Sequence, residues 1–263
     1  MDSITPWFVF FVGAIIGSFL NVCIYRMPLD LSIVAPRSFC PHCKAKIPWY
    51  ENIPLASYLL LRGKCFRCRK PISVRYFLVE LVTAVIAWVL WQRYGLSAEF
   101  AAGAVFFAML LVATMTDFET GLIPDQITIP GMLLGVALSV TGHGHFLQGL
   151  WYQKVLASAA GLVAGGGVLI LTGWFGKIVF RKDSMGFGDV KLLAMIGAFI
   201  GAPKVGLVFL LAPFPALPLA LWQRFIKKEE TIPFGPFLAL AGALVFAKGD
   251  AVLNFIAKLY GVN

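Results

Sequence analysis

The chain has 263 residues, of which 59% are hydrophobic and only 13% are charged, and its mean hydropathy is +0.83. Soluble domains average about 45–50% apolar and about 25% charged residues, so this composition excludes an ordinary soluble domain and predicts an all-α polytopic membrane protein. The net charge of +9 would suit nucleic acid, but no basic patch with interleaved aromatic residues accompanies it. Basic residues of membrane proteins gather in cytoplasmic loops, so we expect membrane lipid as a partner and no nucleic acid.

The first apolar segment, residues 6–24, is predicted to be a retained membrane helix. Its N-terminal flank carries Asp2 and no Lys or Arg, and no small-x-small cleavage site follows it, in contrast to a signal peptide. Positive charge begins at Arg26. The C-terminal end of this helix is therefore expected to face the cytoplasm.

The one long polar stretch, residues 25–76, holds ten of the 22 Lys and Arg residues and four of the five cysteines. The cysteines form two C-x2-C pairs with 21 residues between them: Cys40, Cys43, Cys65 and Cys68. Two such pairs can supply four thiolates to a tetrahedral Zn²⁺, and four protein ligands leave no place for a catalytic water, so the predicted zinc is structural. Two disulfides or free thiols are the alternatives, and a reducing cytoplasmic loop disfavours disulfides.

Seven further apolar segments follow, which makes about eight transmembrane helices in all. Several are shorter than the ~20 residues of a full span, and short segments interrupted by Gly or Pro can be half-helices around a polar site. The segments are residues 77–91, 100–116, 127–140, 155–178, 190–200, 205–222 and 233–246, the last extending to 256 in its longest version.

Threading eight spans from an outside N-terminus places the loops 25–76, 117–126, 177–191 and 223–232 inside. These loops contain 17 of the 22 basic residues, which agrees with the positive-inside rule. The same threading puts the carboxylates of residues 117, 125 and 189 on the cytoplasmic side.

Two carboxylates stand where apolar segments meet polar loops. Asp189 follows Gly186 and Gly188 at the start of one segment, and Asp117 ends another. A carboxylate that enters a membrane costs up to about 2.5–3.5 kcal/mol, so a functional reason is expected. In a paired-aspartate centre the ionised carboxylate takes a proton from water and the protonated one polarises a carbonyl. The alternatives are that Asp189 is an N-cap and that Asp117 marks where a span meets water.

Three other ionisable residues are weaker site candidates. Glu80 lies inside the second span and is either functional or paired with basic residues of the loop. Lys191 can pair with Asp189 or extend to the membrane interface. Asp125 follows Pro124, which is typical of a plain turn and helix entry. No Gly-x-Ser-x-Gly, His-Glu-x-x-His or Walker motif offers other hydrolytic chemistry.

Taken in order along the chain, these motifs resemble those of the bacterial type IV prepilin peptidases, a family of Gly-x-Gly-Asp membrane aspartyl proteases. The resemblance is carried by the four cysteines and by Gly-Ser-Phe-Leu-Asn-Val-Cys-Ile-Tyr-Arg at 17–26, Pro-Ile-Ser-Val-Arg-Tyr-Phe-Leu-Val-Glu-Leu at 71–81, Asp117 to Asp125, Gly186 to Ala194, and Ile-Pro-Phe-Gly-Pro-Phe-Leu at 232–238.

The resemblance implies an enzyme of the bacterial inner membrane with its active site facing the cytoplasm. Such enzymes cut the basic leader from prepilins and pseudopilins after a glycine, and then methylate the new N-terminal residue with S-adenosylmethionine. By position, Asp117 and Asp189 are the catalytic pair, the four cysteines bind zinc, and Glu80 is a methyl-transfer candidate. The implied domains are a first helix (1–24), a zinc loop (25–76) that together with it forms a methyltransferase-associated region, and a peptidase domain (77–263).

Three competing functions remain open from the sequence. The first is a peptidase that does not methylate. The second is a proton-coupled transporter in which the two aspartates relay protons, although transporters more often carry carboxylates at the middle of spans and show repeated halves. The third is a zinc-loop assembly subunit without chemistry.

Overall fold

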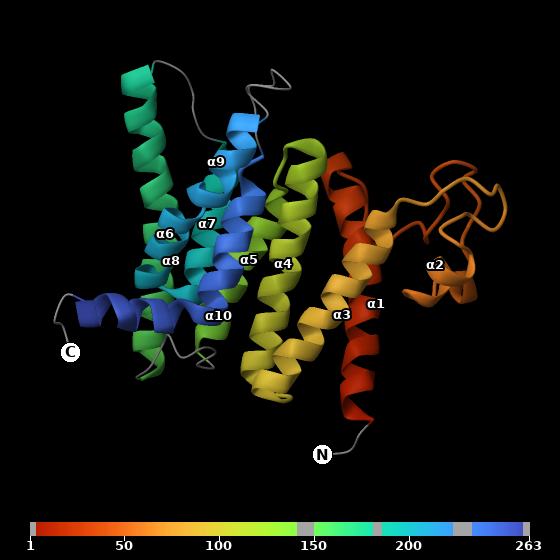
Figure 1. Cartoon of the computed structure of the whole chain (residues 1–263), viewed down its shortest axis with the longest axis horizontal. Helices are drawn as coiled ribbons and strands as arrows, with labels where there is room; N and C mark the ends of the chain where they lie inside the picture. Colours follow the sequence, from red (N-terminus) through yellow and green to blue (C-terminus); the bar gives the residue numbers. More distant parts are fainter. Residues whose placement is uncertain (1–3, 141–149, 181–185, 223–232, 260–263) are drawn as a thin grey trace. The chain divides into compact units, whose positions relative to one another are not determined.

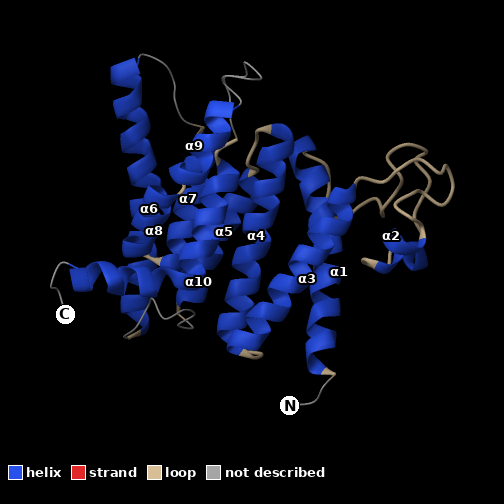
Figure 2. Ribbon diagram, in the orientation of Figure 1, coloured by secondary structure: helices blue, strands red, loops and turns tan. Residues whose placement is uncertain are grey.

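The structure is a computed structural model that describes residues 4–140, 150–180, 186–222 and 233–259, and every regular element in these ranges is a helix (Figures 1 and 2). Six helical segments of the described part are long and apolar enough to cross a membrane. The prediction of an all-α, multi-pass membrane protein is therefore confirmed. The predicted inside loop 223–232 lies outside the described residues. The chain divides into two compact units, Met1–Val112 and Ala113–Asn263.

The first unit contains α1 (Thr5–Arg26), α3 (Val74–Tyr94) and the part of α4 (Ala98–Thr120) that ends at Val112. α1 and α3 pack closely because α1 carries a Gly-x-x-x-Gly pattern. A Cβ atom on Gly13 would lie 2.9 Å from the Ala84 Cα atom, and one on Gly17 would lie 2.7 Å from the Glu80 Cα atom. Gly13 thus faces Ala84, and Gly17, four residues later on α1, faces Glu80, four residues earlier on α3. The two helices therefore run antiparallel.

The polar loop between α1 and α3 has only short elements: η1 (Met27–Leu29), η2 (Trp49–Glu51) and α2 (Ala56–Leu60). It is tied to the end of α1 by Arg26, which is 5% exposed. The guanidinium donates hydrogen bonds to the backbone oxygens of Ser32 (2.8 Å) and Pro36 (2.7 Å). A buried cation that satisfies loop carbonyls fixes the start of the loop against the helix pair.

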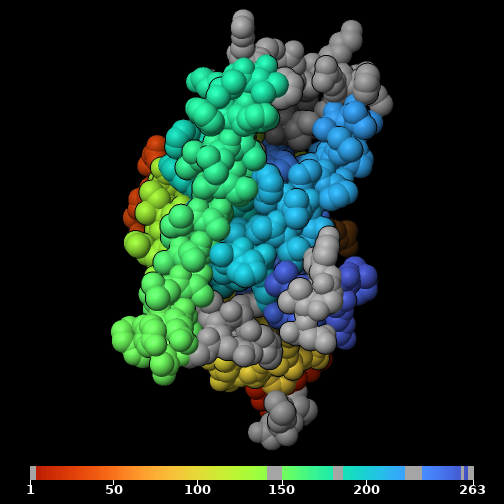
Figure 3. Space-filling model, turned by 90° about the vertical axis from the view of Figure 1, so that its left-hand side faces the viewer, coloured from red at the N-terminus to blue at the C-terminus, as the bar shows by residue number. Residues whose placement is uncertain are grey.

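The second unit contains the end of α4 and six further helices: α5 (Asp125–Ser139), α6 (Trp151–Phe180), α7 (Phe187–Ile200), α8 (Ala202–Leu211), α9 (Pro213–Trp222) and α10 (Gly235–Leu259). On the face shown in Figure 3, α6 (green) lies beside the α8–α9 segment (blue).

The centre of this unit is α7, whose residues 192–200 are all buried. A helix that is apolar and buried all round needs neighbours on every side, and α5, α6, α8 and α10 provide them. Backbones approach most closely where Gly161 of α6 meets Gly197 of α7, since a Cβ atom on either would collide with the carbonyl oxygen of the other. Nearby, the Ser158 hydroxyl donates to the Ala198 oxygen (2.6 Å).

Each of the eight predicted apolar segments is helical, but their ends differ from the predictions. α5 and α7 have 15 and 14 residues, so each is about 21–23 Å long and falls short of a bilayer core of about 30 Å. α7 begins three residues earlier than the predicted residue 190. The predicted segment 205–222 breaks at Pro213, which has no N–H to continue the α8 ladder.

Candidate functional site

Asp117 lies in the last turn of α4 and is 6% exposed. Its Oδ2 atom accepts a hydrogen bond from the backbone N–H of Gly235, the first residue of α10, at 2.9 Å. A carboxylate at the C-terminal end of its own helix meets the negative end of that helix dipole. The first N–H groups of a helix have no partner within that helix, so the Gly235 N–H is available to Asp117. Its hydrogen bond, from the positive end of α10, offsets the unfavourable position of the carboxylate at the end of α4.

Gly235 is a site residue that sequence reasoning missed. A Cβ atom there would lie 2.7 Å from Asp117 Oδ2 and 3.0 Å from Ile123 Cδ1, so only glycine lets the α10 backbone reach the carboxylate. The sequence signal is Gly235-Pro236, because Pro at the second position of a helix, just after a small residue, marks a helix start.

Asp189 is the third residue of α7, and Gly186 is the N-cap. The interpretation of Asp189 as the N-cap is therefore wrong. Its carboxylate bonds to the backbone of Gly186, as the third residue of a capping box does. The Asp189 carboxylate is half-buried at the positive end of α7. Both aspartates are thus held by the backbone of a glycine at a helix start.

The structure brings Asp117 and Asp189 together, close enough for the two charges to repel each other. Ile123 packs between the two helix starts: a Cβ atom on Gly188 would lie 3.1 Å from the Ile123 Cβ atom, and Gly235 meets the other end of the same side chain. Two carboxylates in such a site do not easily both ionise. This is the arrangement that a water-activating aspartyl centre requires.

Lys191 and Asp125 form a pair of their own beside this centre. The Lys191 Nζ atom lies 2.7 Å and 2.8 Å from the two carboxylate oxygens of Asp125. Lys191 therefore pairs with Asp125 and not with Asp189. Both side chains are partly exposed, at 32% and 54%, so the pair adds little stability and serves to hold the start of α5 beside the first turns of α7.

The four loop cysteines converge in the first unit, with all four Sγ atoms within 4.8 Å of one another. The Sγ atoms of Cys40 and Cys68 are 3.9 Å apart. Tetrahedral Zn²⁺ with Zn–S bonds of about 2.3 Å places its sulfurs about 3.8 Å apart, so the cluster fits the ion. None of the four cysteines forms a disulfide in this structure, in contrast to the disulfide alternative.

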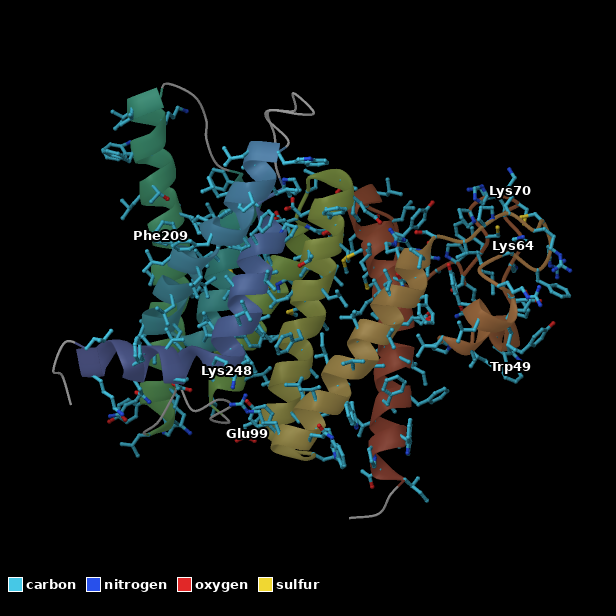
Figure 4. The ribbon with its side chains drawn as sticks, in the orientation of Figure 1. Trp49, Lys64, Lys70, Glu99, Phe209 and Lys248 are labelled. Carbon is cyan, nitrogen blue, oxygen red and sulfur yellow. The ribbon has the colours of Figure 1, made fainter. Side chains whose placement is uncertain are left out.

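The two cysteine pairs are two copies of one turn, 25 residues apart. In the first, Cys40 N–H donates to Ala45 and Lys44 N–H donates to Cys40; in the second, Cys65 N–H donates to Lys70 and Arg69 N–H to Cys65, all at 2.9 Å. Lys44 and Arg69 share a positive φ, 57° and 59°. A β-bridge closes each turn, and Lys64 and Lys70 border the loop sulfurs (Figure 4).

Glu80 is 9% exposed and also belongs to the first unit. Its Oε2 atom accepts a hydrogen bond from the Leu55 N–H at 2.7 Å, and the Ser18 hydroxyl bonds to the same carboxylate. Its partners are therefore a loop backbone and a neighbouring hydroxyl, whereas the alternative from the sequence was a basic side chain of the loop.

Comparison with known proteins gives the family. The model described as "Bacterial Peptidase A24 N-terminal domain" matches residues 11–94, and the model of the "Type IV leader peptidase family" matches residues 104–221. This chain belongs to the type IV leader peptidase family. The first match covers the helices and loop that hold the cysteines, and the second covers both aspartates of the candidate centre.

Curated relatives of this leader peptidase chain carry the name "Prepilin leader peptidase/N-methyltransferase". The protein of Burkholderia pseudomallei (strain 1026b) is 32% identical over 90% of this chain and 83% of its own length. That of Myxococcus xanthus (strain DK1622) is 35% identical, with coverages of 89% and 88%. That of Aeromonas hydrophila is 34% identical, with coverages of 95% and 94%. No solved structure matches the chain.

Proposed function

We propose that this protein is a bifunctional enzyme of the bacterial inner membrane. It removes the basic leader of type IV prepilins and pseudopilins after a glycine, and it methylates the new N-terminal residue with S-adenosylmethionine. The observation that carries the peptidase half is the pairing of Asp117 with Asp189, each held by a glycine backbone at a helix start. The names of the relatives support both halves.

In the proposed cleavage, Asp117 and Asp189 act as one unit that carries a single proton. The ionised carboxylate takes a proton from a water molecule, whose oxygen attacks the scissile carbonyl carbon, while the protonated carboxyl donates to the carbonyl oxygen. When the tetrahedral intermediate collapses, the carboxyl that took the proton from water passes it to the leaving nitrogen, and the other carboxylate takes a proton back from a hydroxyl of the intermediate. The N–H of Gly235 orients Asp117, and the backbone of Gly186 orients Asp189. The two roles belong to the pair and are not divided between its members.

The proposed substrate fits a centre at a membrane surface. A prepilin carries a basic leader before an apolar helix, so the helix lies in the bilayer and the scissile bond lies at its edge. The excess of basic residues in the predicted inside loops supports a centre that faces the cytoplasm.

We assign the cysteine cluster to one structural Zn²⁺, held by Cys40, Cys43, Cys65 and Cys68. A zinc ion with four thiolate ligands has no open position for water, so it contributes to the fold of the loop and not to bond cleavage. The proposed domains remain 1–24 and 25–76 for the methyltransferase-associated region and 77–263 for the peptidase.

Mass spectrometry of a prepilin incubated with the purified full-length enzyme and S-adenosylmethionine tests this function. We expect loss of the leader mass together with the gain of one methyl group. Leader loss without methylation would favour a peptidase that does not methylate. An intact prepilin, from several different sources and with well-folded enzyme, would contradict the proposal and move the transporter alternative to the front.

A further inference from the structure

Asn21 presents a buried acceptor that the fold leaves unused. The side chain is 2% exposed, and its Nδ2 atom donates to the backbone oxygens of Gly17 (3.3 Å) and Tyr76 (3.0 Å). Two carbonyl partners fix which end of the amide is nitrogen. The Oδ1 atom then has no hydrogen-bond partner within the described residues. A buried acceptor without a donor is costly, so the free Oδ1 atom points to a ligand that donates to it.

Glu80 lies one helical turn away from Asn21 in the same contact between α1 and α3. Tyr76 and Glu80 are one turn apart on α3, and Gly17 and Asn21 are one turn apart on α1, with Gly17 packed on Glu80 and Asn21 bonded to Tyr76. The Leu55 N–H reaches the carboxylate. Within the described ranges no Lys or Arg side chain forms a salt bridge with Glu80.

The side chains of Asn21 and Glu80 in this part of the α1–α3 contact predict the kind of ligand. It offers a buried carboxylate and a buried amide oxygen, both of which accept hydrogen bonds, and no salt bridge to the carboxylate is formed within the described residues. A compact cation with several N–H donors complements such a pair, and an aliphatic ammonium has three donors and a point charge. The Leu55 N–H and the Ser18 hydroxyl already bond to this carboxylate, and an opposite charge would offset more of its desolvation.

We propose that Asn21 and Glu80 form the binding site of an α-ammonium group during methyl transfer. The inference rests on the proposed function, which supplies two sources of that group: the N-terminal amine that cleavage exposes on the pilin, and the amino-acid end of S-adenosylmethionine. The proposal concerns recognition of the ammonium, and no covalent bond to Glu80 or Asn21 is involved.

Binding measured without turnover, on the full-length protein in nanodiscs, tests the assignment. One pair of probes is a peptide with the mature pilin N-terminus and its N-acetylated form, which lacks the charge. The other pair is S-adenosylhomocysteine, which carries the same amino-acid end as S-adenosylmethionine, and methylthioadenosine, which lacks that end; both have an uncharged sulfur. We expect wild-type protein to prefer the charged member of one pair by at least about tenfold, and Glu80→Gln to lose that preference. The pair affected identifies the source.

Glu80→Gln is a suitable variant because an amide oxygen still accepts from the Leu55 N–H. Thr83→Val is the matched control: Thr83 lies one turn further along α3, is 8% exposed, and its hydroxyl donates only within the helix, to Val79 (2.7 Å). The control should keep the preference. Leader cleavage and thermal unfolding of each variant report whether it is folded.

Two results would overturn the assignment. One is an unchanged preference for both charged probes in a folded Glu80→Gln variant. The other needs no variant: wild-type protein that binds both members of each pair equally. Either result leaves the proposed function standing, because that function is judged separately by leader loss and methyl gain. Wild type that cleaves and never methylates would instead contradict the methylating half.

Discussion

The carboxylate of Asp117 accepts a hydrogen bond of 2.9 Å from the backbone N–H of Gly235, a residue 118 positions further along the chain. This bond makes the start of α10 part of the candidate centre. It also explains how a carboxylate at the end of α4 can be buried, since the donor comes from the positive end of another helix.

We predict that Gly235→Ala lowers the rate of leader cleavage by about 100-fold or more. The added methyl would lie 2.7 Å from Asp117 Oδ2, so the carboxylate or α10 must shift, and a displacement of about 1 Å in a catalytic group costs on the order of 100-fold. Cleavage of a prepilin followed over time measures the effect.

Gly206→Ala on α8 is the control, since a Cβ atom there meets nothing within 4 Å and alanine suits a helix better than glycine. It should cleave at the wild-type rate. A Gly235→Ala variant that also cleaves at that rate would show that the Asp117–Gly235 bond does not orient the carboxylate.

The pair formed by Lys191 and Asp125 should be of little importance for catalysis. Because the two side chains are 32% and 54% exposed, the interaction is worth about 0–1 kcal/mol. We expect Asp125→Asn to slow cleavage by less than about fivefold, which is the factor that 1 kcal/mol represents. A loss as severe as that of Asp117→Asn would place Asp125 in the catalytic pair.

The cysteine cluster predicts one zinc ion per chain. Metal analysis of the purified protein should find this stoichiometry, and Cys40→Ser should remove it, whereas Cys23→Ala, buried in α1, should not. Loss of the metal should unfold the loop, because structural zinc contributes about 10–16 kcal/mol of binding free energy in small zinc domains. Limited proteolysis within 25–76 reports this unfolding.

The same experiment separates the two activities. Methylation should fall before cleavage as the metal is removed, because the loop packs with α1 and α3 and the aspartates belong to the other unit. Equal loss of both activities while the loop still resists protease would contradict a purely structural zinc in the methylating region.

Hydropathy and spacing predicted much of this architecture. The apolar segments became helices because membrane helices bond within themselves, so local sequence determines them. The cysteine cluster could be predicted because C-x2-C spacing specifies its own turn. The repetition of this turn 25 residues later could not be predicted, because the two turns share little sequence beyond their cysteines and nearby basic residues.

The partners of the charged side chains could not be predicted. Lys191 lies two residues from Asp189 in sequence, yet it bonds to Asp125, since α5 and α7 pack together and only tertiary structure shows which side chains meet. Gly235 was missed for the same reason. Gly235-Pro236 marks a helix start, but the role of Gly235 depends on a contact across 118 residues, which no local pattern shows.

The most direct test of the paired-aspartate centre is prepilin cleavage by Asp117→Asn and Asp189→Asn, with Asp125→Asn as the matched control. The amide has nearly the shape of the carboxylate but cannot take a proton from water. We predict that each of the first two variants inserts and folds like wild type and loses cleavage by at least about 1,000-fold. The control should keep most of its activity. Cleavage that survives in either Asp117→Asn or Asp189→Asn would contradict the account.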